Sequence, residues 1–428
     1  MQPDLSVTFD ADSLSDVEGF WSQSPEAQEG VFHQLRELDG MFFSNERALE
    51  VDGEVVLPPG PGYYSVVRHA EIVEASRKPE LFCSGQGSNI VDLPTEFNDF
   101  FGNMINMDDP RHARMRGIVG RAFTPRVMAQ IQDSIAAKAT EIVDQIAAKG
   151  SCDFVTEVAA RLPLAMICDL MGIPEEQFDT VFEQSNVILS NGDPEYIPEG
   201  ANPLEAILGA GGLLAGIMTD LITEREAAPK DDLTTALLTA ELDGERLTGE
   251  EMASFFILLC VAGNETTRNS ISHGMKLLTE NPEQRAMLLS DLDGRMGGAV
   301  EEIVRVASPV MHFRRTVTTD GTMLGDQELN AGDKVILWYG SGNRDERVFD
   351  NPYDFDISRD NSAQIGFGGP GPHFCLGAHL ARRQINVMFQ ELLSRLPDIA
   401  MVGEPDYLRS NFINGIKHLQ VEFTPVAG

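Results

Sequence analysis

Apolar residues recur every three to four positions along much of this chain, which is the spacing of helices that bury one face. The pattern dominates from about residue 110 to 183 and is clearest from residue 248 to about 280. Thr248 and Glu251 have the spacing of a capping box at its start, and an Asn-Pro pair ends it. A helix of about 30 residues is about 45 Å long, so we predict that this one crosses the whole molecule.

Shorter elements follow the long helix. Residues 298–307 form a helical stretch that stops before a proline, and another helix starts near Cys375 and runs to about residue 396. Residues 310–340 alternate as strands do. Because no Pro/Ser-rich linker and no internal repeat interrupts the chain, we predict a single large domain over residues 17–428. We expect it to be mainly α with minor β sheets, behind a flexible acidic tail at residues 1–16.

Charge limits the classes of partner. Lys and Arg total 32 and Asp and Glu 67, which gives a formal charge of −35. Nucleic acid and anionic membranes attract basic surfaces, so neither is expected as a partner. The longest apolar runs, near residues 206–218 and 255–263, are shorter than a membrane span, and the acidic N-terminus lacks the order of a signal peptide. We expect a cytoplasmic monomer.

Cys375 stands in an unusual setting. The segment Phe367–Gly377 reads F-G-G-P-G-P-H-F-C-L-G and directly precedes a predicted helix. The positive end of a helix lowers the pKa of a cysteine, and glycines let the backbone approach a large flat ligand. A thiolate so placed is a suitable axial ligand for haem iron. A glycine-rich turn with a buried cysteine is the alternative; a phosphate-binding loop would need a Lys-Ser/Thr pair that is absent here.

The long helix has a polar interruption at its midpoint. Nine apolar residues from Phe255 are followed by Asn264, Glu265, Thr266 and Thr267. A threonine hydroxyl that bonds a backbone carbonyl bends a helix and opens a groove, which could hold dioxygen next to a Glu/Thr pair that relays protons. Alternatively, these polar residues simply emerge on a solvated face.

Two further patterns involve charged residues. Glu302 and Arg305 lie three residues apart among apolar neighbours, so they are either a surface ion pair or a buried one. Residues 110–132 contain five arginines and no acidic residue, a local reversal in a strongly acidic chain. This stretch is either a solvated basic face or a site for anionic partners, such as haem propionates or an acidic ferredoxin.

Together, the Cys375 loop, the A-G-x-E-T run and the E-x-x-R pair resemble the cytochrome P-450 family in order and approximate spacing, from about residue 20 to the C-terminus. The resemblance implies the P-450 fold, with haem b buried between the long central helix and the helix after Cys375. It implies that Cys375 is the iron ligand, that Glu265 and Thr266 are the distal acid–alcohol pair, and that a buried structural group is formed by Glu302, Arg305 and Arg359. Haem contacts are implied for His112, Arg116, Arg315 and His373 at the propionates, and for Phe367, Ala262 and Gly263.

The implied activity is monooxygenation. One oxygen atom from O2 enters a C–H bond of a hydrophobic substrate, with electrons from NAD(P)H through a ferredoxin reductase and a ferredoxin. We expect the ferredoxin near the helix that carries Arg111, Arg114 and Arg116. Phe367 lies eight residues before the cysteine, one more than usual. This lengthened loop is similar to that of an actinobacterial subgroup that oxidises terminal methyl groups of methyl-branched lipids and the cholesterol side chain.

ω-Hydroxylation of a methyl-branched lipid or fatty acid is therefore the expected reaction. Steroid side-chain or terpenoid hydroxylation, a haem-binding sensor without turnover, and a protein without haem are the alternatives. A dry apolar substrate pocket is expected, although each residue taken singly could be ordinary core. Its candidate residues are Phe97, Phe100, Phe101, Met104, Ile188, Leu189, Leu259, Ala262, Val310, Phe313, Phe412 and Ile413.

Overall fold

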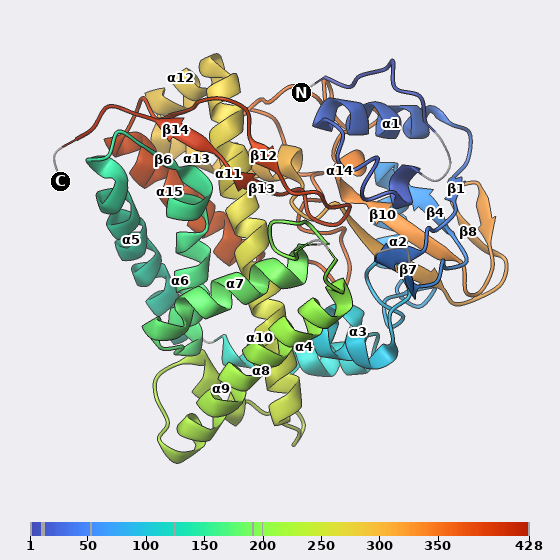
Figure 1. Ribbon diagram of the computed structural model, residues 1–428, viewed down its shortest axis with the longest axis horizontal. Helices are drawn as coiled ribbons and strands as arrows, with labels where there is room; N and C mark the ends of the chain where they lie inside the picture. Colours follow the sequence, from blue (N-terminus) through green and yellow to red (C-terminus); the bar gives the residue numbers. More distant parts are fainter. Residues whose placement is uncertain are drawn as a thin grey trace.

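The computed structural model describes residues 2–9, 13–51, 54–123, 125–190, 192–198 and 200–426. Helices form most of the molecule, as Figure 1 shows. Their bounds are α1 (Pro25–Glu37), α2 (His69–Arg77), α3 (Thr95–Gly102), α4 (Arg111–Ala122), α5 (Pro125–Ala147), α6 (Arg161–Met171), α7 (Phe178–Leu189), α8 (Pro203–Ala227), α9 (Leu233–Thr239), α10 (Gly249–Leu258), α11 (Glu265–Glu280), α12 (Pro282–Ser290), α13 (Leu292–Ala307), α14 (Tyr339–Gly342) and α15 (Ala378–Arg395).

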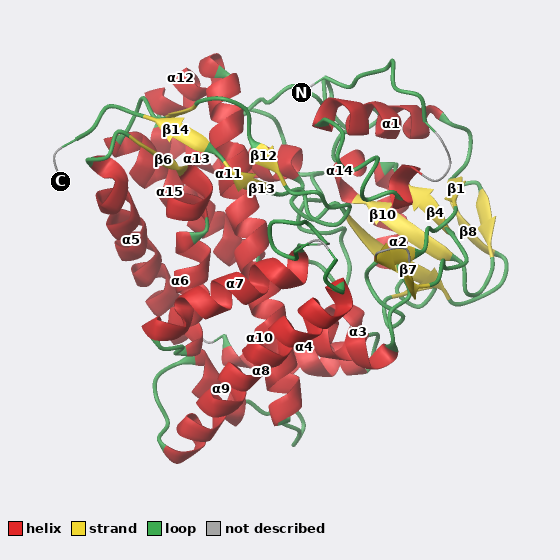
Figure 2. Ribbon diagram, viewed as in Figure 1, coloured by secondary structure: helices red, strands yellow, loops and turns green. Residues whose placement is uncertain are grey.

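The strands are short and belong to small sheets. A five-stranded sheet has the order β1-β4-β10-β7-β5, in which β10 runs parallel to β4 and the other pairs are antiparallel. Figure 2 shows it on the right of the molecule beside α1 and α2, with most helices on the other side. The strands are β1 (Phe42–Ser44), β2 (Leu49–Val51), β3 (Glu54–Leu57), β4 (Tyr63–Val66), β5 (Phe82–Cys83), β6 (Ser151–Asp153), β7 (His312–Val317), β8 (Thr322–Leu324), β9 (Gln327–Leu329), β10 (Lys334–Trp338), β11 (Ala400–Met401), β12 (Asp406–Tyr407), β13 (Ile416–His418) and β14 (Gln420–Glu422).

The predicted long helix is present, and its start is the predicted capping box. The Thr248 hydroxyl accepts from the Glu251 N–H, and the Glu251 carboxylate accepts from the Thr248 N–H. The helix consists of α10, a π-helical segment at Leu259–Asn264, and α11. Its first part packs against α8 and its second part against α13 and α15. The π-helical segment therefore lies between the part of the helix that packs on α8 and the part that packs on α13 and α15. The predicted polar run begins at its last residue, Asn264.

The N-terminal segment, which was expected to be a flexible acidic tail, makes several contacts in its described part. The indole N–H of Trp21 donates to the Leu14 carbonyl at 3.0 Å, and the Asp4 N–H donates to the Glu26 carbonyl at 2.9 Å. Leu14 is fully buried, and Val7 and Phe9 pack against the same apolar cluster as α1. Three apolar side chains of this acidic segment therefore contact the rest of the molecule, and its flexibility stays a prediction.

Helix α8 is more apolar than expected. Its 25 residues are long and apolar enough to cross a membrane by length and composition, the one such helix in the described part of the chain. It packs against α7, α9 and α10, which accounts for its buried face. On its outer face Leu208 is 48 % exposed and Leu213 55 % exposed.

Candidate functional site

Cys375 lies in the loop that leads into α15, three residues before that helix begins. The Cys375 N–H donates to the Phe367 carbonyl at 3.0 Å, which closes the loop on itself. Burial raises the pKa of the Cys375 thiol, whereas the backbone N–H of Gly377 and the cations Arg116 and Arg382 favour the thiolate and act in the opposite direction. The sulfur thus has an N–H donor and two positive charges near it, and Cys375 is only partly shielded from water.

The glycines of this loop allow it to pack tightly against α2. A Cβ atom on Gly369 would lie 2.4 Å from the Ser76 hydroxyl, and one on Gly371 would lie 2.1 Å from the Ser76 carbonyl. Gly371 also has a φ of +156°, which L side chains rarely adopt. On the other side of the loop, the Arg382 guanidinium lies over the Phe367 ring at 4.1 Å from its centroid. The cysteine is therefore held on a rigid frame.

Four cationic or imidazole side chains lie in or near this loop, namely those of His112, Arg116, Arg315 and His373. The rings of His112 and His373 lie 4.3 Å apart, and burial together with nearby positive charge lowers the pKa of both. His112 Nε2 is buried without a hydrogen-bond partner. Arg116 donates to the Phe374 carbonyl and Arg315 to the Arg314 carbonyl. In the described residues neither arginine pairs with a carboxylate. The cluster therefore has unpaired positive charge, and His112 adds a ring nitrogen without a partner.

The polar interruption is buried, and it has the geometry predicted for it. The Thr266 hydroxyl donates to the Ala262 carbonyl at 2.7 Å, within the π-helical segment. Asn264 is fully buried and Glu265 is 1 % exposed, so the alternative of a solvated face is wrong. Both polar side-chain atoms of Asn264 lack partners in the described structure. A Cβ atom on Gly263 would lie 3.1 Å from Ile167, which indicates how closely α6 approaches.

Glu265 has a partner that the sequence analysis missed. Arg268 donates one N–H to Glu265 Oε2 and another to Asn186 Oδ1 of α7 at 2.7 Å. Glu265 Oε1 is buried and has no hydrogen-bond partner among the described residues. Burial raises the pKa of Glu265, and Arg268 offsets part of that rise. The signal was available, because Glu265 and Arg268 have the same three-residue spacing as Glu302 and Arg305.

The second Glu/Arg pair is fully buried, which resolves the choice between surface and interior. Arg305 donates two N–H groups to the Glu302 carboxylate at 2.7 and 2.8 Å, and Arg359 donates to it at 3.3 Å. Arg305 also donates to three backbone carbonyls in the segment that leads to the Cys375 loop, those of Asn343, Pro352 and Asp354.

Comparison with known proteins decides the family. The family described as Cytochrome P450 matches residues 209–397. The methyl-branched lipid omega-hydroxylase of Mycobacterium tuberculosis is 44 % identical over 418 residues, 96 % of this chain and 95 % of the relative. The steroid C26-monooxygenase of Rhodococcus jostii is 40 % identical over 435 residues, 100 % of this chain and 87 % of the relative. The structure of Mycobacterium marinum cytochrome P450 CYP268A2 in complex with pseudoionone matches with a TM-score of 0.89 and 42 % identity, covering 99 % of each chain.

This chain belongs to the cytochrome P450 family. It is a monooxygenase, and the expected fold of one mainly helical unit with small sheets is confirmed. The family implies haem, and the residues present fit that group. A thiol with nearby N–H and cationic groups suits the iron. The N–H donors of the two histidines and two arginines near the loop suit the two propionate carboxylates of haem.

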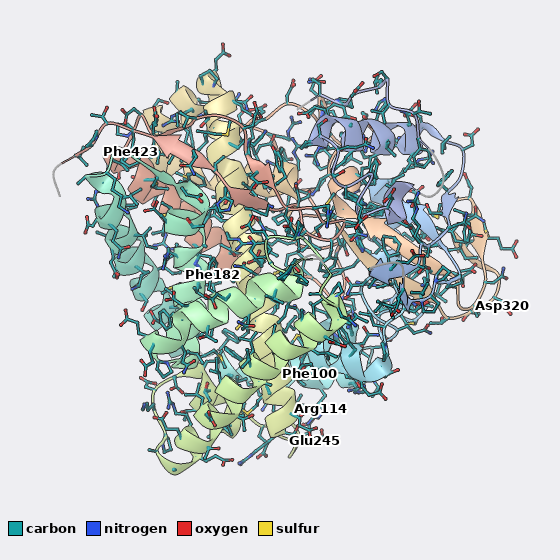
Figure 3. All side chains as sticks on the ribbon, viewed as in Figure 1. Phe100, Arg114, Phe182, Glu245, Asp320 and Phe423 are labelled. Carbon is teal, nitrogen blue, oxygen red and sulfur yellow. The ribbon has the colours of Figure 1, made fainter. Side chains whose placement is uncertain are left out.

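Part of the positive charge of α4, the basic helix of this P450, is paired with carboxylates of the same chain. Arg114 forms ion pairs with Glu245 and with Glu251, which also belongs to the capping box. Figure 3 labels Arg114 and Glu245 near each other at the lower edge of the molecule. Arg111 is exposed and lies 3.7 Å from Asp99. A local run of arginines in the sequence therefore overstates the free charge of this surface.

The candidate pocket residues of the P450 fall into two groups. On α3, the Phe97 and Phe101 rings lie 4.5 Å apart and the Phe100 and Phe101 rings 4.9 Å apart. A Cβ atom on Gly211 of α8 would lie 2.7 Å from the Phe101 ring, so this glycine lets α8 cover the cluster closely. Met104 packs with this group in the core beside α10, together with Leu259, Ala262 and Ile188 at its edge.

The second group lies on the side of the five-stranded sheet. Val310 forms a β-bridge with Ile413, and the Phe313 and Phe412 rings lie 5.8 Å apart. Leu189 is half-buried at the end of α7. The structure thus places the candidates in separate apolar clusters and does not bring them all into mutual contact.

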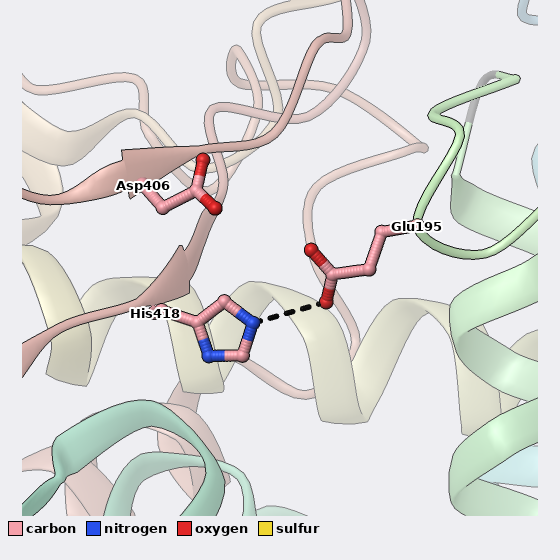
Figure 4. A group of neighbouring side chains, drawn as sticks. All are labelled: Glu195, Asp406 and His418. Carbon is pink, nitrogen blue, oxygen red and sulfur yellow. Dashed lines mark hydrogen bonds and ion pairs between the residues drawn. The ribbon is translucent and has the colours of Figure 1, made fainter.

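A separate group of possible metal ligands is an ion-pair network. Glu195, Asp406 and His418 lie close together in Figure 4. The Lys417 ammonium lies 3.1 Å from Glu195 and 3.7 Å from Asp406, and His418 also contacts Asp153. The lysine and the imidazole form ion pairs with these carboxylates, so this group gives no indication of a metal site.

Proposed function

We propose that this P450 hydroxylates the terminal methyl group of a methyl-branched lipid. The observation that carries the proposal is its 44 % identity, over almost the whole of both chains, with enzymes named methyl-branched lipid omega-hydroxylases. The apolar candidate residues on α3 and on the sheet side agree with a hydrophobic substrate. Steroid side-chain oxidation is the second candidate, because steroid C26-monooxygenases are 38–40 % identical.

In this proposal Cys375 holds the iron, and His112, Arg116, Arg315 and His373 bind the propionates. Haem, when bound, supplies the activation of dioxygen and the insertion of one oxygen atom into a C–H bond. His112 Nε2 and the two arginines without carboxylate partners are suited to bind anionic oxygens. Ala262, Gly263 and Phe367 would line the same site.

Thr266 and Glu265 deliver protons in this proposal. The Thr266 hydroxyl donates its hydrogen bond to the Ala262 carbonyl, so its oxygen can accept one from a proton donor, and Glu265 Oε1, which has no partner among the described residues, can hold a proton. A buried carboxyl whose pKa is raised exchanges protons closer to neutral pH than an exposed one. A haem sensor without turnover would need neither group.

A ferredoxin is the proposed electron donor to this cytoplasmic protein, through the surface near Arg111 and Arg116. Both lie on α4, and Arg116 is near enough to Cys375 to stabilise its thiolate. Arg114 is left out of the proposal because its charge is paired with Glu245 and Glu251.

The test is a binding and product panel. Methyl-branched fatty acids and alcohols, linear fatty acids, cholest-4-en-3-one and pseudoionone are titrated against the purified P450, and binding is read from the shift of the haem absorption band. Products formed with a surrogate ferredoxin and reductase are then identified by mass spectrometry. The proposal expects terminal alcohols from the branched lipids at the highest kcat/KM. A kcat/KM at least tenfold higher for the steroid would replace the first candidate with the second.

A further inference from the structure

Arg268 is a buried cation whose surroundings are not explained by packing alone. It lies on α11, one turn after Glu265, and only 4 % of it is exposed. It donates to Glu265 and to Asn186, and its guanidinium lies 6.0 Å from the centroid of the Phe182 ring on α7. A buried charge is costly unless it is paired and hydrogen-bonded. The position of this cation beside the distal acid Glu265 therefore indicates a role for Arg268 in the distal site.

The contacts of Glu265 show what the arginine does there. Arg268 engages Oε2 alone, and Oε1 stays buried without a partner. A bidentate pair such as Glu302 with Arg305 would use both oxygens and lock the carboxylate. The one-sided pair instead fixes the orientation of the carboxylate and leaves one oxygen free to gain or lose a proton.

Arg268 also connects the acid to a different part of the fold. Asn186 lies on α7, which packs against α8 and against the π-helical segment. The connection after α7 adds Tyr196, whose pKa is raised by burial and which is close enough to feel the charges of both Arg268 and Glu265. Titratable groups that face Glu265 are therefore Arg268 on its own helix and Tyr196 on this connection, with Asp193 and Glu195 beyond it.

We propose that Arg268 is the positioning residue of the distal acid, and that Asn186 ties its position to helix α7. This inference rests on the proposed function of Glu265 in proton delivery. With the ion pair intact, Glu265 is ionised and oriented by Oε2. A proton taken from solvent at Oε1 gives the neutral carboxylic acid, and its onward transfer restores the carboxylate and the ion pair.

The test follows the protonation of Glu265 directly. Infrared titration of the haem-loaded protein measures the carboxyl band of Glu265, assigned by its loss in Glu265→Gln. Arg268→Gln removes the cation, and the midpoint of the band is expected to move up by about 1–3 pH units, as expected for loss of an adjacent arginine. Asn186→Asp adds a competing anion and is expected to move it in the same direction. Arg268→Lys keeps the charge and is expected to stay nearer to the wild-type midpoint.

Kinetics give the second measurement. The kcat of Arg268→Gln is expected to fall by about tenfold to hundredfold with little change in KM, because proton transfer is lost while substrate contacts remain. The matched control is Arg225→Gln, which also breaks a buried arginine–carboxylate pair, with Asp232, but does not contact Glu265. It is expected to lower stability and leave both the infrared midpoint and the pH profile of kcat unchanged.

An unchanged midpoint in folded Arg268→Gln and Asn186→Asp would overturn the inference. So would an equal shift in Arg225→Gln, since that would indicate a general effect of losing a buried ion pair. If Arg268→Gln does not fold, the Asn186→Asp and Arg268→Lys midpoints decide the matter. Because the infrared readout needs no turnover, its failure is distinct from a failure of the proposed substrate or reaction.

Discussion

Glu302 illustrates, at the scale of single residues, how a buried charge can be fully satisfied. Its two oxygens accept from Arg305 and Arg359 and from the Asp356 N–H, and none of its surface is exposed. Arg305 in turn donates to backbone carbonyls between residues 343 and 354. The group therefore secures the irregular segment before the Cys375 loop, which has few hydrogen bonds of its own from regular structure.

We expect Glu302→Gln to destabilise the protein by about 3–5 kcal/mol, because it leaves the buried Arg305 guanidinium, and the partly exposed one of Arg359, without their counter-charge. The free energy of unfolding from denaturant titration measures this. Glu141→Gln is the control, since Glu141 is 53 % exposed and pairs with Lys138 on the surface. Its cost is expected to be below about 1 kcal/mol, and equal costs for the two variants would contradict this account of the group.

Thr266→Val replaces the hydroxyl with a methyl group of similar size. The Ala262 carbonyl loses its donor at 2.7 Å, while the helix keeps a β-branched residue. We expect haem binding to persist and product formed per NAD(P)H consumed to fall by about tenfold or more, because the hydroxyl no longer takes part in proton delivery. Thr267→Val, at the neighbouring buried position, is the control. An unchanged product yield in Thr266→Val would show that the hydroxyl has only a structural role.

At the scale of elements, the pattern of apolar residues was a good guide to helices and a poor one to their internal geometry. It predicted the long helix and its capping box, since both depend on residues near in sequence. The chemistry of the polar run led correctly to the threonine–carbonyl bond. Two features were not predicted: the π-helical geometry of residues Leu259–Asn264 and the contact of Arg268 with α7. Both depend on contacts between distant segments, which a local sequence pattern does not contain.

The connection between α7 and α8 is attached to β13 and β6 by charged groups, and this attachment is expected to depend on pH. His418 contacts Asp153 and Glu195, and its pKa is raised by the hydrogen bond and charge of Asp153 and by Glu195. A raised pKa means that the folded state binds the proton more tightly than the unfolded state does. The resulting stability is fully present below about pH 6.5 and is lost as pH rises through the folded-state pKa.

His418→Gln removes this contribution. The difference in free energy of unfolding between the wild type and the variant is expected to be largest near pH 6 and to shrink toward about pH 8. Denaturant titrations of both proteins across this range measure it. A difference that grows with pH would mean that the imidazole acts mainly as a neutral hydrogen-bond partner.

At the scale of the whole molecule, a strongly acidic chain carries one short basic helix. The net charge is −35, yet the side chain of Arg111, the first residue of α4, is 64 % exposed. Composition could predict neither the contacts of the N-terminal segment nor the internal pairing of Arg114. Each is a tertiary property, since it depends on which distant residue supplies the partner.

Arg111→Glu tests the docking of the donor. We expect ferredoxin-driven turnover to weaken, with a higher KM for ferredoxin, while substrate-induced spectral shifts stay the same, because the repulsion acts only on the acidic partner. Lys149→Glu, a similar charge reversal in the connection between α5 and β6, is the control. Equal effects of the two variants would indicate a response to net charge and would remove α4 from the docking site.

The central claim is that Cys375 supplies a thiolate to haem iron, and the absorption spectrum of the dithionite-reduced, carbon-monoxide-bound protein tests it most directly. The account predicts a strongly red-shifted Soret band for the wild type. It predicts loss of that band in Cys375→Ala, while Cys260→Ala, which removes a different buried cysteine, keeps it. A wild-type spectrum without the red shift, or a red-shifted band that survives in Cys375→Ala, would contradict the account.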